Sequence, residues 1–242
     1  MDWKTDMHSN LWVFPRGMKR NGETGENSLE WTSRYGSVVT SAFEIASTDG
    51  MNEKGLVANL LWLPETEYPV RDKNKPGLAI TAWVQYMLDN FATVEEAVAY
   101  IDEDTFQVVS DMMPDGSRLA TLHLSISDAT GDCAIFEYIG GKLTVYHSKE
   151  YKVMTNSPTY NKQLALSEYW KSIGGLSFLP GTNRAADRFA RASFYINALP
   201  ETDDERIAVA SVFSVVRNAS VPYGISTPES PEISTTQWRT VS

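Results

Sequence analysis

The stretch Val153–Tyr160, VMTNSPTY, decides how the middle of this chain can fold. An apolar run ends there, and Pro158 cannot donate a further hydrogen bond to a sheet. From Tyr160 onward, apolar residues recur at helical spacing. The pattern predicts a strand that turns into a helix, with the amide of Asn156 at the turn, where it and backbone N–H groups can hold an oxyanion. The other interpretation is an ordinary turn in which Asn156 and Ser157 only cap the helix.

Upstream of this turn, the sequence predicts several short strands. Leu11–Phe14 is wholly apolar and stops at Pro15, which is typical of a short buried strand. Asp49–Leu56 contains Asp-Gly and a second glycine, which predicts tight turns. Val57–Leu63 follows as an apolar strand whose far end brings Trp62 to a sheet edge. Residues 119–147 predict an antiparallel meander that leads toward the central turn.

Helical patterns separate and follow these strands. One apolar helical face runs from Ile80 to Phe91, and Thr93 with Glu96 resembles a capping box that starts a second helix. We expect both helices to cover one face of a sheet. Three more helices are predicted over residues 159–173, about 183–198 and 203–217. Antiparallel strands with segregated helices indicate an α+β fold.

Size and composition favour one large domain over residues 1–242. The chain has 242 residues, 42% of them hydrophobic, and a net charge of −10. The acidity and the lack of a basic patch argue against nucleic acid as a partner, and no apolar run is long enough to span a bilayer. Both ends of the sequence resemble cut ends: residues 236–242 alternate like a strand without a partner turn. We therefore expect an incomplete domain.

The sequence contains few of the usual combinations of catalytic residues. The histidines at 8, 123 and 147 show no metal-ligand spacing, and neither a phosphate-binding loop nor a serine-hydrolase elbow is present. Cys133 is the only cysteine, and the neighbouring Asp132 disfavours its thiolate. We interpret Cys133 as structural. The sequence suggests no cofactor and no metal.

Three polar residues stand out instead, namely Asp2, Asn156 and Arg188. Arg188 lies in a predicted helix in which Arg184, Arg188 and Arg191 share a face. Such a stripe is usually exposed to solvent, but the phenylalanines of the same helix indicate burial, so one arginine can point inward.

These pieces resemble one known family. Met1-Asp2-Trp3, Asn52-Glu53-Lys54-Gly55-Leu56, Thr155-Asn156-Ser157-Pro158-Thr159 and Asp187-Arg188-Phe189 occur in this order, and together they resemble the choloylglycine hydrolase family, which includes bile salt hydrolases and penicillin V acylases. The resemblance covers essentially the whole chain. Its tryptophan-rich segments are similar to those of the Gram-negative branch of the family. A further interpretation is a generic α+β domain in which these motifs match by chance.

The resemblance implies a four-layer αββα sandwich of the N-terminal nucleophile type, here truncated at both ends. In that family a cysteine becomes residue one after processing, and its free α-amine acts as the base for its own thiol. An α-amine has an ordinary pKa of about 7.7–8.0, so it can accept a proton at neutral pH. That cysteine lies upstream of the Met-Asp-Trp motif and has no counterpart in this sequence. We therefore expect the chain as given to be inactive.

The resemblance also assigns roles to individual residues. Asp2 matches the aspartate that hydrogen-bonds the amine of the nucleophile, Asn156 the oxyanion-hole amide, and Arg188 the arginine that steadies the charge of the nucleophile. Trp62 falls where the family offers a backbone N–H to the oxyanion. The aromatic side chains of Trp3, Trp12, Trp62 and Tyr68 can supply an acyl pocket, although Trp12 fits a core position equally well.

The expected activity is hydrolysis of a linear amide bond in a small molecule with an apolar acyl group. Penicillin V, acyl homoserine lactones and conjugated bile salts all fit, and the tryptophans favour the first two. The alternative is a non-catalytic ligand-binding protein on the same scaffold. The resemblance further implies a homotetramer when the chain is full length. Localisation is open, with the periplasm or secretion expected if a signal peptide precedes Met1.

Overall fold

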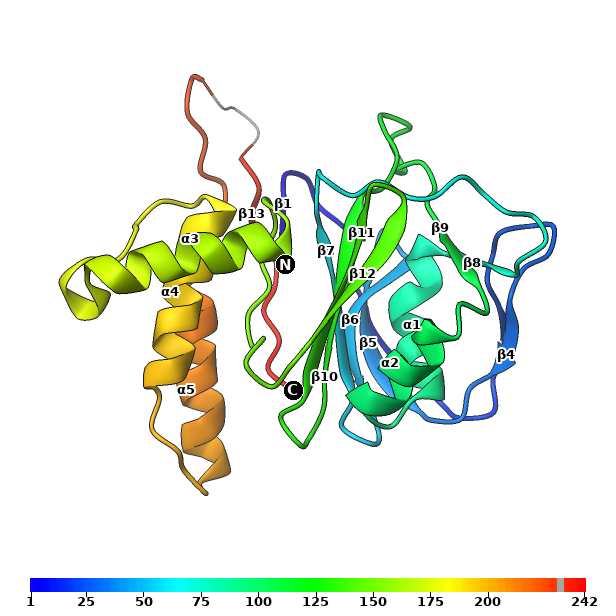
Figure 1. The fold of residues 1–242 in the computed structure, drawn as a ribbon, viewed down its shortest axis with the longest axis horizontal. Coiled ribbons are helices and arrows are strands. Elements are labelled where there is room, and N and C mark those ends of the chain that lie inside the picture. Colours follow the sequence, from blue (N-terminus) through cyan, green and yellow to red (C-terminus); the bar gives the residue numbers. More distant parts are fainter. Residues whose placement is uncertain (230–232) are drawn as a thin grey trace. The chain divides into compact units, whose positions relative to one another are not determined.

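The computed structural model describes residues 1–229 and 233–242 (Figure 1). It divides into two compact units, which are described separately below. The sheet unit comprises residues 8–151 together with residue 242, and the helical unit comprises residues 1–7 and 152–241. The helical unit is thus assembled from two segments that are far apart in the sequence.

The sheet unit is built around a seven-stranded antiparallel sheet (Figure 1). The order across the sheet is β12-β11-β10-β7-β6-β5-β2. The strands are β2 (Leu11–Phe14), β5 (Ser37–Ala42), β6 (Ala46–Asn52), β7 (Val57–Trp62), β10 (Leu122–Ser127), β11 (Cys133–Ile139) and β12 (Lys142–His147). The predicted meander of residues 119–147 is confirmed as β10, β11 and β12.

Strand β2 forms where the sequence predicts it, but the expectation that it is buried is wrong. It pairs only with β5 and lies at one edge of the sheet. Leu11 is 70% exposed, Val13 74% and Trp12 44%. An unbroken apolar run is typical of strands that are covered on both faces. Strand β2 has such a sequence although it lies at an edge and is largely exposed.

The predicted turn at Asp49–Leu56 begins later than expected. Asp49 and Gly50 lie inside strand β6, and the turn spans only residues 53–56. A Cβ atom on Gly50 would lie 2.5 Å from the carbonyl oxygen of Val38 on the neighbouring strand. This glycine therefore permits close strand packing, whereas Gly55, with a φ of +82°, is the one that makes the turn.

Two smaller strand pairs belong to the same unit. Strands β3 (Lys19–Asn21) and β4 (Glu30–Thr32) pair antiparallel, and β8 (Gly77–Ala79) pairs parallel with β9 (Gln107–Val109). The charged sequence of β3 gives no strand signal, so only its pairing with β4 identifies it as a strand. A parallel pair needs a long crossover connection, and here the two helices of the unit form it.

These two helices cover one face of the sheet, as predicted (Figure 1). A short 3₁₀ turn η1 (Ile80–Ala82) leads into α1 (Trp83–Asn90), and α2 (Val94–Asp102) follows. The Thr93 hydroxyl accepts a hydrogen bond from the Glu96 N–H at 3.2 Å, which confirms the predicted cap. The Glu96 carboxylate reaches back to the N–H of Ala92 at 2.8 Å.

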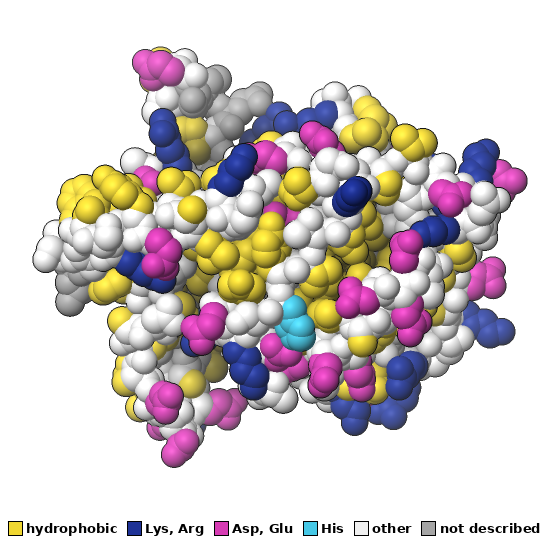
Figure 2. All heavy atoms as spheres, in the orientation of Figure 1, with side chains coloured by type: hydrophobic (Ala, Val, Ile, Leu, Met, Phe, Trp, Pro, Cys, Tyr) yellow, Lys and Arg dark blue, Asp and Glu magenta, His cyan; other side chains and the backbone are white. Residues whose placement is uncertain are grey.

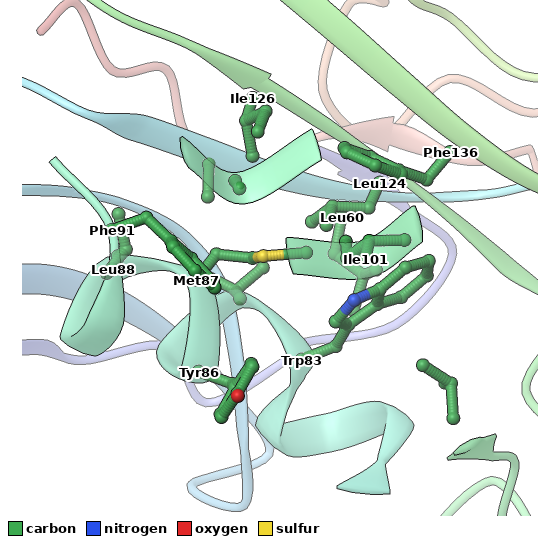
Figure 3. Close-up of a cluster of buried hydrophobic side chains, with 14 of the residues drawn as sticks. Leu60, Trp83, Tyr86, Met87, Leu88, Phe91, Ile101, Leu124, Ile126 and Phe136 are labelled. Atoms are coloured by element: carbon green, nitrogen blue, oxygen red, sulfur yellow. The ribbon is translucent and has the colours of Figure 1, made fainter. Parts of the chain in front are cut away.

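The core of the sheet unit lies between these helices and the sheet (Figure 3). Trp83, Met87 and Leu88 of α1 are fully buried against Leu60 and Leu124 of the sheet. Full burial of one such side chain stabilises the fold by about 1.5–3 kcal/mol. Trp83 and Met87 are therefore core residues.

Asn52, from the second family-like motif, joins α1 to the sheet. Its Nδ2 group donates to the carbonyl oxygens of Leu88 and Phe91 at 2.8 and 2.7 Å. Its Oδ1 atom accepts from the N–H groups of Lys54 and Leu56, both at 3.0 Å. This side chain is 2% exposed and its amide is paired on both sides, so it stabilises the end of the helix and the turn together.

Within its described residues, the helical unit contains one short antiparallel strand pair and three long helices. Residues of β1 pair with residues of β13 in the register Asp2↔Thr236 and Trp3↔Thr235. The elements are β1 (Asp2–Trp3), α3 (Tyr160–Ile173), the 3₁₀ turn η2 (Gly175–Ser177), α4 (Ala185–Ala198), α5 (Glu205–Asn218) and β13 (Thr235–Thr236). Helix α4 packs against both α3 and α5, and the rings of Tyr160 and Phe189 meet edge to face.

The helices match their predicted ranges, whereas two predicted strands do not form. Residues 151–155 have no strand structure, and within residues 236–242 only Thr236 belongs to a strand, although the Gln237 N–H donates to the carbonyl oxygen of Met1 at 2.9 Å. Both segments have strand-like composition, but pairing requires a neighbour along the whole length of a segment. The α+β class is confirmed in both units. The single domain over residues 1–242 stays a prediction.

Charged side chains of both signs lie on the surface of the described part of the chain (Figure 2). Acidic and basic side chains are interspersed on the face shown in Figure 2, so neither sign gathers over one element there. Within residues 1–229 and 233–242, no helix combines the length and the hydropathy needed to cross a membrane.

Candidate active site

The central turn, residues 153–160, is held by Gln163 from the first turn of α3. The fully buried Gln163 side chain donates from Nε2 to the carbonyl oxygens of Asn156 and Pro158, the latter at 2.7 Å. The hydroxyl of Thr155 donates to Gln163 Oε1 at 2.7 Å. Three residues of the turn are thus bound to one buried amide, and this fixes the position from which the Asn156 side chain projects.

Arg188 of α4 meets that side chain. Its Nη2 atom donates to Oδ1 of Asn156 at 2.7 Å, and its Nε atom donates to the carbonyl oxygen of Asn183 at 3.0 Å. The Asn156 amide is therefore turned so that its oxygen faces the guanidinium. Its Nδ2 group lies on the other branch of the amide and can donate to an oxyanion. The interpretation of Asn156 as only a helix cap is wrong, since Thr159 is the N-cap of α3.

Asp2 of β1 lies on another side of the same guanidinium. Its Oδ2 atom is 3.6 Å from Arg188 Nη1. Its Oδ1 atom accepts a hydrogen bond of 2.6 Å from the hydroxyl of Thr236, the residue opposite it in the β1–β13 pair. The Thr236 hydroxyl also accepts from the N–H of Val221 at 2.8 Å. The carboxylate is thus held by an arginine on one side and a threonine on the other.

The three predicted residues Asp2, Asn156 and Arg188 therefore meet inside the helical unit. We call them, with Thr236, the Arg188 network. The side chains of Arg188 and Asp2 are only 14% and 19% exposed. Burial lowers the pKa of the Arg188 guanidinium, and the nearby Asp2 carboxylate opposes that shift. The network places a largely buried cation and a largely buried anion next to an amide, which is suited to holding charge that develops during a reaction.

The other arginines of α4 have different surroundings. Arg191 is 8% exposed and donates from Nη1 to the carbonyl oxygens of Pro180 and Thr182 at 2.7 and 2.8 Å. Arg184 is exposed. The expectation that one arginine points inward is thus an underestimate, because Arg188 joins the network and Arg191 holds the loop before the helix.

The predicted aromatic residues divide between the two units. Trp3 lies on β1 beside Asp2, whereas Trp12, Trp62 and Tyr68 belong to the sheet unit. Trp62 pairs with Leu122 across the sheet, and the Tyr68 hydroxyl accepts from the Leu122 N–H at 3.1 Å. Trp62 and Tyr68 are therefore both neighbours of Leu122.

Trp12 does not join this pair. It lies on the edge strand β2, and three strand spacings of about 4.8 Å, roughly 14 Å of sheet, separate β2 from β7, the strand of Trp62. Its indole Nε1 donates to the Ser41 hydroxyl at 3.1 Å, and its ring lies parallel to that of Phe14. Because Trp12 is 44% exposed, its interpretation as a core residue is wrong.

In the sheet unit, Cys133, His123 and His147 each lie next to an acidic side chain. Cys133 begins β11, and its N–H donates to the Asp132 carboxylate at 3.0 Å. The same carboxylate lies 2.7 Å from Nε2 of His147. His123 and Glu137 pair at 3.0 Å and are both fully buried. Across the described residues, no group of three or more His, Cys, Asp or Glu side chains is arranged to hold a metal ion.

Sequence reasoning missed Thr236 and Gln163. Thr236 lies more than 230 residues from Asp2 in the chain, so only strand pairing brings the two together. Gln163 could have been suspected, because a glutamine on the apolar face of a helix, one turn after a proline-containing turn, needs buried partners.

Comparison with known proteins supports the predicted resemblance. A family model described as linear amide C–N hydrolases, choloylglycine hydrolase family, matches residues 1–242. A penicillin V acylase from Pectobacterium atrosepticum is 54% identical over the whole chain, which spans 69% of that protein.

Two solved structures extend the comparison. A penicillin V acylase from Agrobacterium tumefaciens has a TM-score of 0.90 and 60% identity, with 98% of this chain and 72% of that chain covered. A variant of a conjugated bile acid hydrolase from Clostridium perfringens has a TM-score of 0.80 and 27% identity, with 98% and 79% covered. The predicted fold of the N-terminal nucleophile type is confirmed.

Proposed function

Because this chain belongs to the choloylglycine hydrolase family of linear amide C–N hydrolases, we propose that it hydrolyses small amides whose acyl group has an apolar body. Penicillin V and acyl homoserine lactones are the preferred substrates, ahead of conjugated bile salts. The Arg188 network carries this proposal, because it joins an aspartate, an amide and an arginine that the family resemblance separately assigns to the site.

The nucleophile in this proposal is a cysteine that precedes Asp2 and becomes the first residue of the mature enzyme. Its α-amine takes the proton of its own thiol, and the thiolate attacks the carbonyl carbon of the substrate. The amide nitrogen leaves with a proton as a free amine, and water then hydrolyses the thioester. Cys133 has no role in these steps.

Each member of the network has a task in this reaction. Nδ2 of Asn156 donates to the oxyanion that forms when the thiolate attacks, and Arg188 orients that amide through the 2.7 Å hydrogen bond to Oδ1. Asp2 accepts a hydrogen bond from the α-amine. Arg188 also offsets the negative charge that develops nearby. The resemblance implies a second oxyanion donor, the backbone N–H of Trp62 in the sheet unit, and this stays a prediction.

The preference for penicillin V-type acyl groups rests on two observations. The penicillin V acylases are 54% and 60% identical to this chain, whereas the bile acid hydrolase is 27% identical. Each unit also supplies aromatic side chains: Trp3 follows Asp2 directly in the helical unit, and Trp62 and Tyr68 are both neighbours of Leu122 in the sheet unit. Such rings suit an aromatic or alkyl acyl chain.

A substrate panel tests the proposal. The native protein, produced from its natural gene, is incubated with penicillin V, a long-chain acyl homoserine lactone and a glycine-conjugated bile salt, and the released amine is quantified. We expect the first two to be cleaved with a higher kcat/KM than the bile salt. Cleavage of the bile salt alone would contradict the acyl preference.

Intact mass and N-terminal sequencing of the same preparation test the nucleophile. A mature protein that begins with cysteine supports the mechanism. A mature protein without an N-terminal cysteine, together with substrate binding but no amine release, would replace the proposal by a non-catalytic ligand-binding protein on the same scaffold.

A further inference from the structure

Gln163 anchors the central turn through its backbone as well as its side chain. The side chain donates to the carbonyl oxygens of Asn156 and Pro158 and accepts from the Thr155 hydroxyl. The backbone N–H donates to the carbonyl oxygen of Thr159, the N-cap of α3, at 3.0 Å. Four of the five residues from 155 to 159 are thus bonded to this one glutamine.

The chemistry of these partners requires an amide side chain at position 163. The carbonyl oxygens of Asn156 and Pro158 can only accept, so Nε2 must face them, and Oε1 is left for the Thr155 hydroxyl. An amide supplies two donors and one acceptor without a charge, whereas an ionised glutamate supplies no donor. Because the Gln163 side chain is fully buried, bulk water cannot replace a partner that is lost.

Thr155 extends these contacts to the next helix. It is 5% exposed, and its hydroxyl oxygen lies 2.9 Å from the carbonyl oxygen of Ala185, the first residue of α4. Three residues later in α4, Arg188 donates to Oδ1 of Asn156. Asn156 is therefore held twice, at its backbone carbonyl by Gln163 of α3 and at its side-chain oxygen by Arg188 of α4.

From these contacts we infer that Gln163 is a positioning residue for the amide hydrolysis proposed above, and the inference rests on that proposed function. Gln163 fixes the backbone of Asn156, so that Nδ2 of the Asn156 side chain points at the oxyanion while Arg188 holds Oδ1. A side chain held only at Oδ1 still moves with its backbone. Fixing the backbone as well removes that freedom, and donors that are fixed before the reaction stabilise an oxyanion best.

The kinetics of Gln163→Met, measured on the native protein produced from its natural gene, test the inference. Methionine is similar in length but lacks the amide. We expect kcat for penicillin V to fall about tenfold or more at a nearly unchanged KM, because a displaced oxyanion donor weakens binding of the transition state alone. A raised KM with a native kcat would overturn the inference.

Gln85→Met is the matched control. Gln85 is a buried glutamine of α1 that donates to Ser37 Oγ at 3.1 Å and to Asp89 Oδ1 at 2.7 Å. Its replacement also removes hydrogen bonds from a buried amide, so the melting temperature should fall. The kcat per folded molecule should stay at the native level, because these partners lie in the sheet unit. An equal loss of kcat in Gln85→Met and Gln163→Met would overturn a specific role for Gln163.

A double variant separates positioning from a general loss of stability. If Gln163 acts through Asn156, the combination of Asn156→Ala with Gln163→Met should be no slower than Asn156→Ala alone. Losses in kcat that multiply would show that Gln163 acts independently of Asn156 and would overturn the inference. Should Gln163→Met fail to fold, Thr155→Val takes its place. It removes one hydroxyl, so we expect a loss of about threefold in kcat, again with no further loss when combined with Asn156→Ala.

Crystal structures of the same variants give a readout that needs no turnover. In Gln163→Met or Thr155→Val, the separation of Arg188 Nη2 and Asn156 Oδ1 should exceed about 3.5 Å, the limit of a hydrogen bond, whereas Gln85→Met should keep this bond. An Asn156 amide that stays in its native position would overturn the inference, whether or not the protein is active. If the native protein cleaves no amide but Asn156 is displaced in Gln163→Met, the proposed function is contradicted and the positioning of Asn156 by Gln163 is supported.

Discussion

The sheet unit and the helical unit differ in the interactions that stabilise the inside of each. In the sheet unit, Leu60, Trp83 and Leu124 form a continuous apolar core, and polar residues such as Asn52 only join the layers. In the helical unit, the central contacts are between polar side chains, with Arg188 bound to both Asn156 and Asp2. The sheet unit is therefore built around an apolar core, whereas the helical unit gathers the charged and polar side chains to which our proposal assigns the reaction.

The largest expected effect is on activity, at Asn156. Asn156→Ala should lower kcat by about 10²–10³, because one preorganised oxyanion donor is lost, while the melting temperature changes little. Stopped-flow or steady-state release of the amine from penicillin V measures the effect. Asn197→Ala, at an exposed asparagine of α4, is the matched control. An unchanged kcat in Asn156→Ala would remove the residue from the proposed site.

The next effect is on stability, at Asn52. Asn52→Ala leaves the carbonyl groups of Leu88 and Phe91 without their buried donor, and the free energy of unfolding should fall by about 2 kcal/mol. Activity per folded molecule should stay at the native level. Denaturant unfolding measures the first quantity, with Asn74→Ala at an exposed loop as control. A selective loss of kcat instead would contradict the division of tasks between the units.

Arg188→Lys tests whether the helical unit needs the planar guanidinium or only its positive charge. A lysine keeps the charge but cannot bind Asn156, Asn183 and Asp2 from one planar group, so kcat/KM should fall about tenfold or more. The conservative change Arg184→Lys, at an exposed position of the same helix, should have no effect. Equal activity in both variants would mean that only the charge of Arg188 matters.

Thr236→Val should have a smaller effect of the same kind. The change preserves side-chain shape but removes the hydroxyl that donates to Asp2 and accepts from the Val221 N–H. We expect kcat/KM to fall by about threefold, in line with the ~0.5–1.5 kcal/mol of one hydrogen bond. The effect should be absent in Thr235→Val on the same strand. A purely structural role for Thr236 would lower the melting temperature and leave the kinetics unchanged.

The smallest expected effect is the pH dependence of stability at Asp128. Burial alone would raise the pKa of this carboxyl, but hydrogen bonds from the N–H of Val94 and from Thr130 outweigh it and lower the pKa. A lowered pKa gives stability that is present above the ordinary aspartate pKa of about 3.9 and is lost as the pH falls through the folded value. Asp128→Asn should flatten the melting-temperature profile below pH 4. An unchanged melting-temperature profile would show that the hydrogen bonds to Asp128 contribute nothing to the pH dependence of stability.

Much of the fold follows from local pattern. Five helices lie close to their predicted ranges, because each has apolar residues at helical spacing and three of them start at a recognisable cap or acidic turn. The Thr93 cap is one such signal. The strands of residues 119–147 follow from alternation and glycine turns. The misplaced predictions, the buried β2 and the strands at residues 153–155 and 236–242, depend on neighbours that no local window contains.

The helices, most of the strands, the family resemblance and the three polar residues of the candidate site could all be predicted from the sequence. Tertiary structure decided how those residues act together: Arg188 turns the Asn156 amide, and Thr236, at the opposite end of the chain, holds Asp2. It also decided that Trp12 is exposed and that Gly50 serves packing rather than a turn. The physical reason is that helical and strand periodicity are encoded within a few residues, whereas burial and hydrogen-bond partners depend on contacts between segments far apart in the chain.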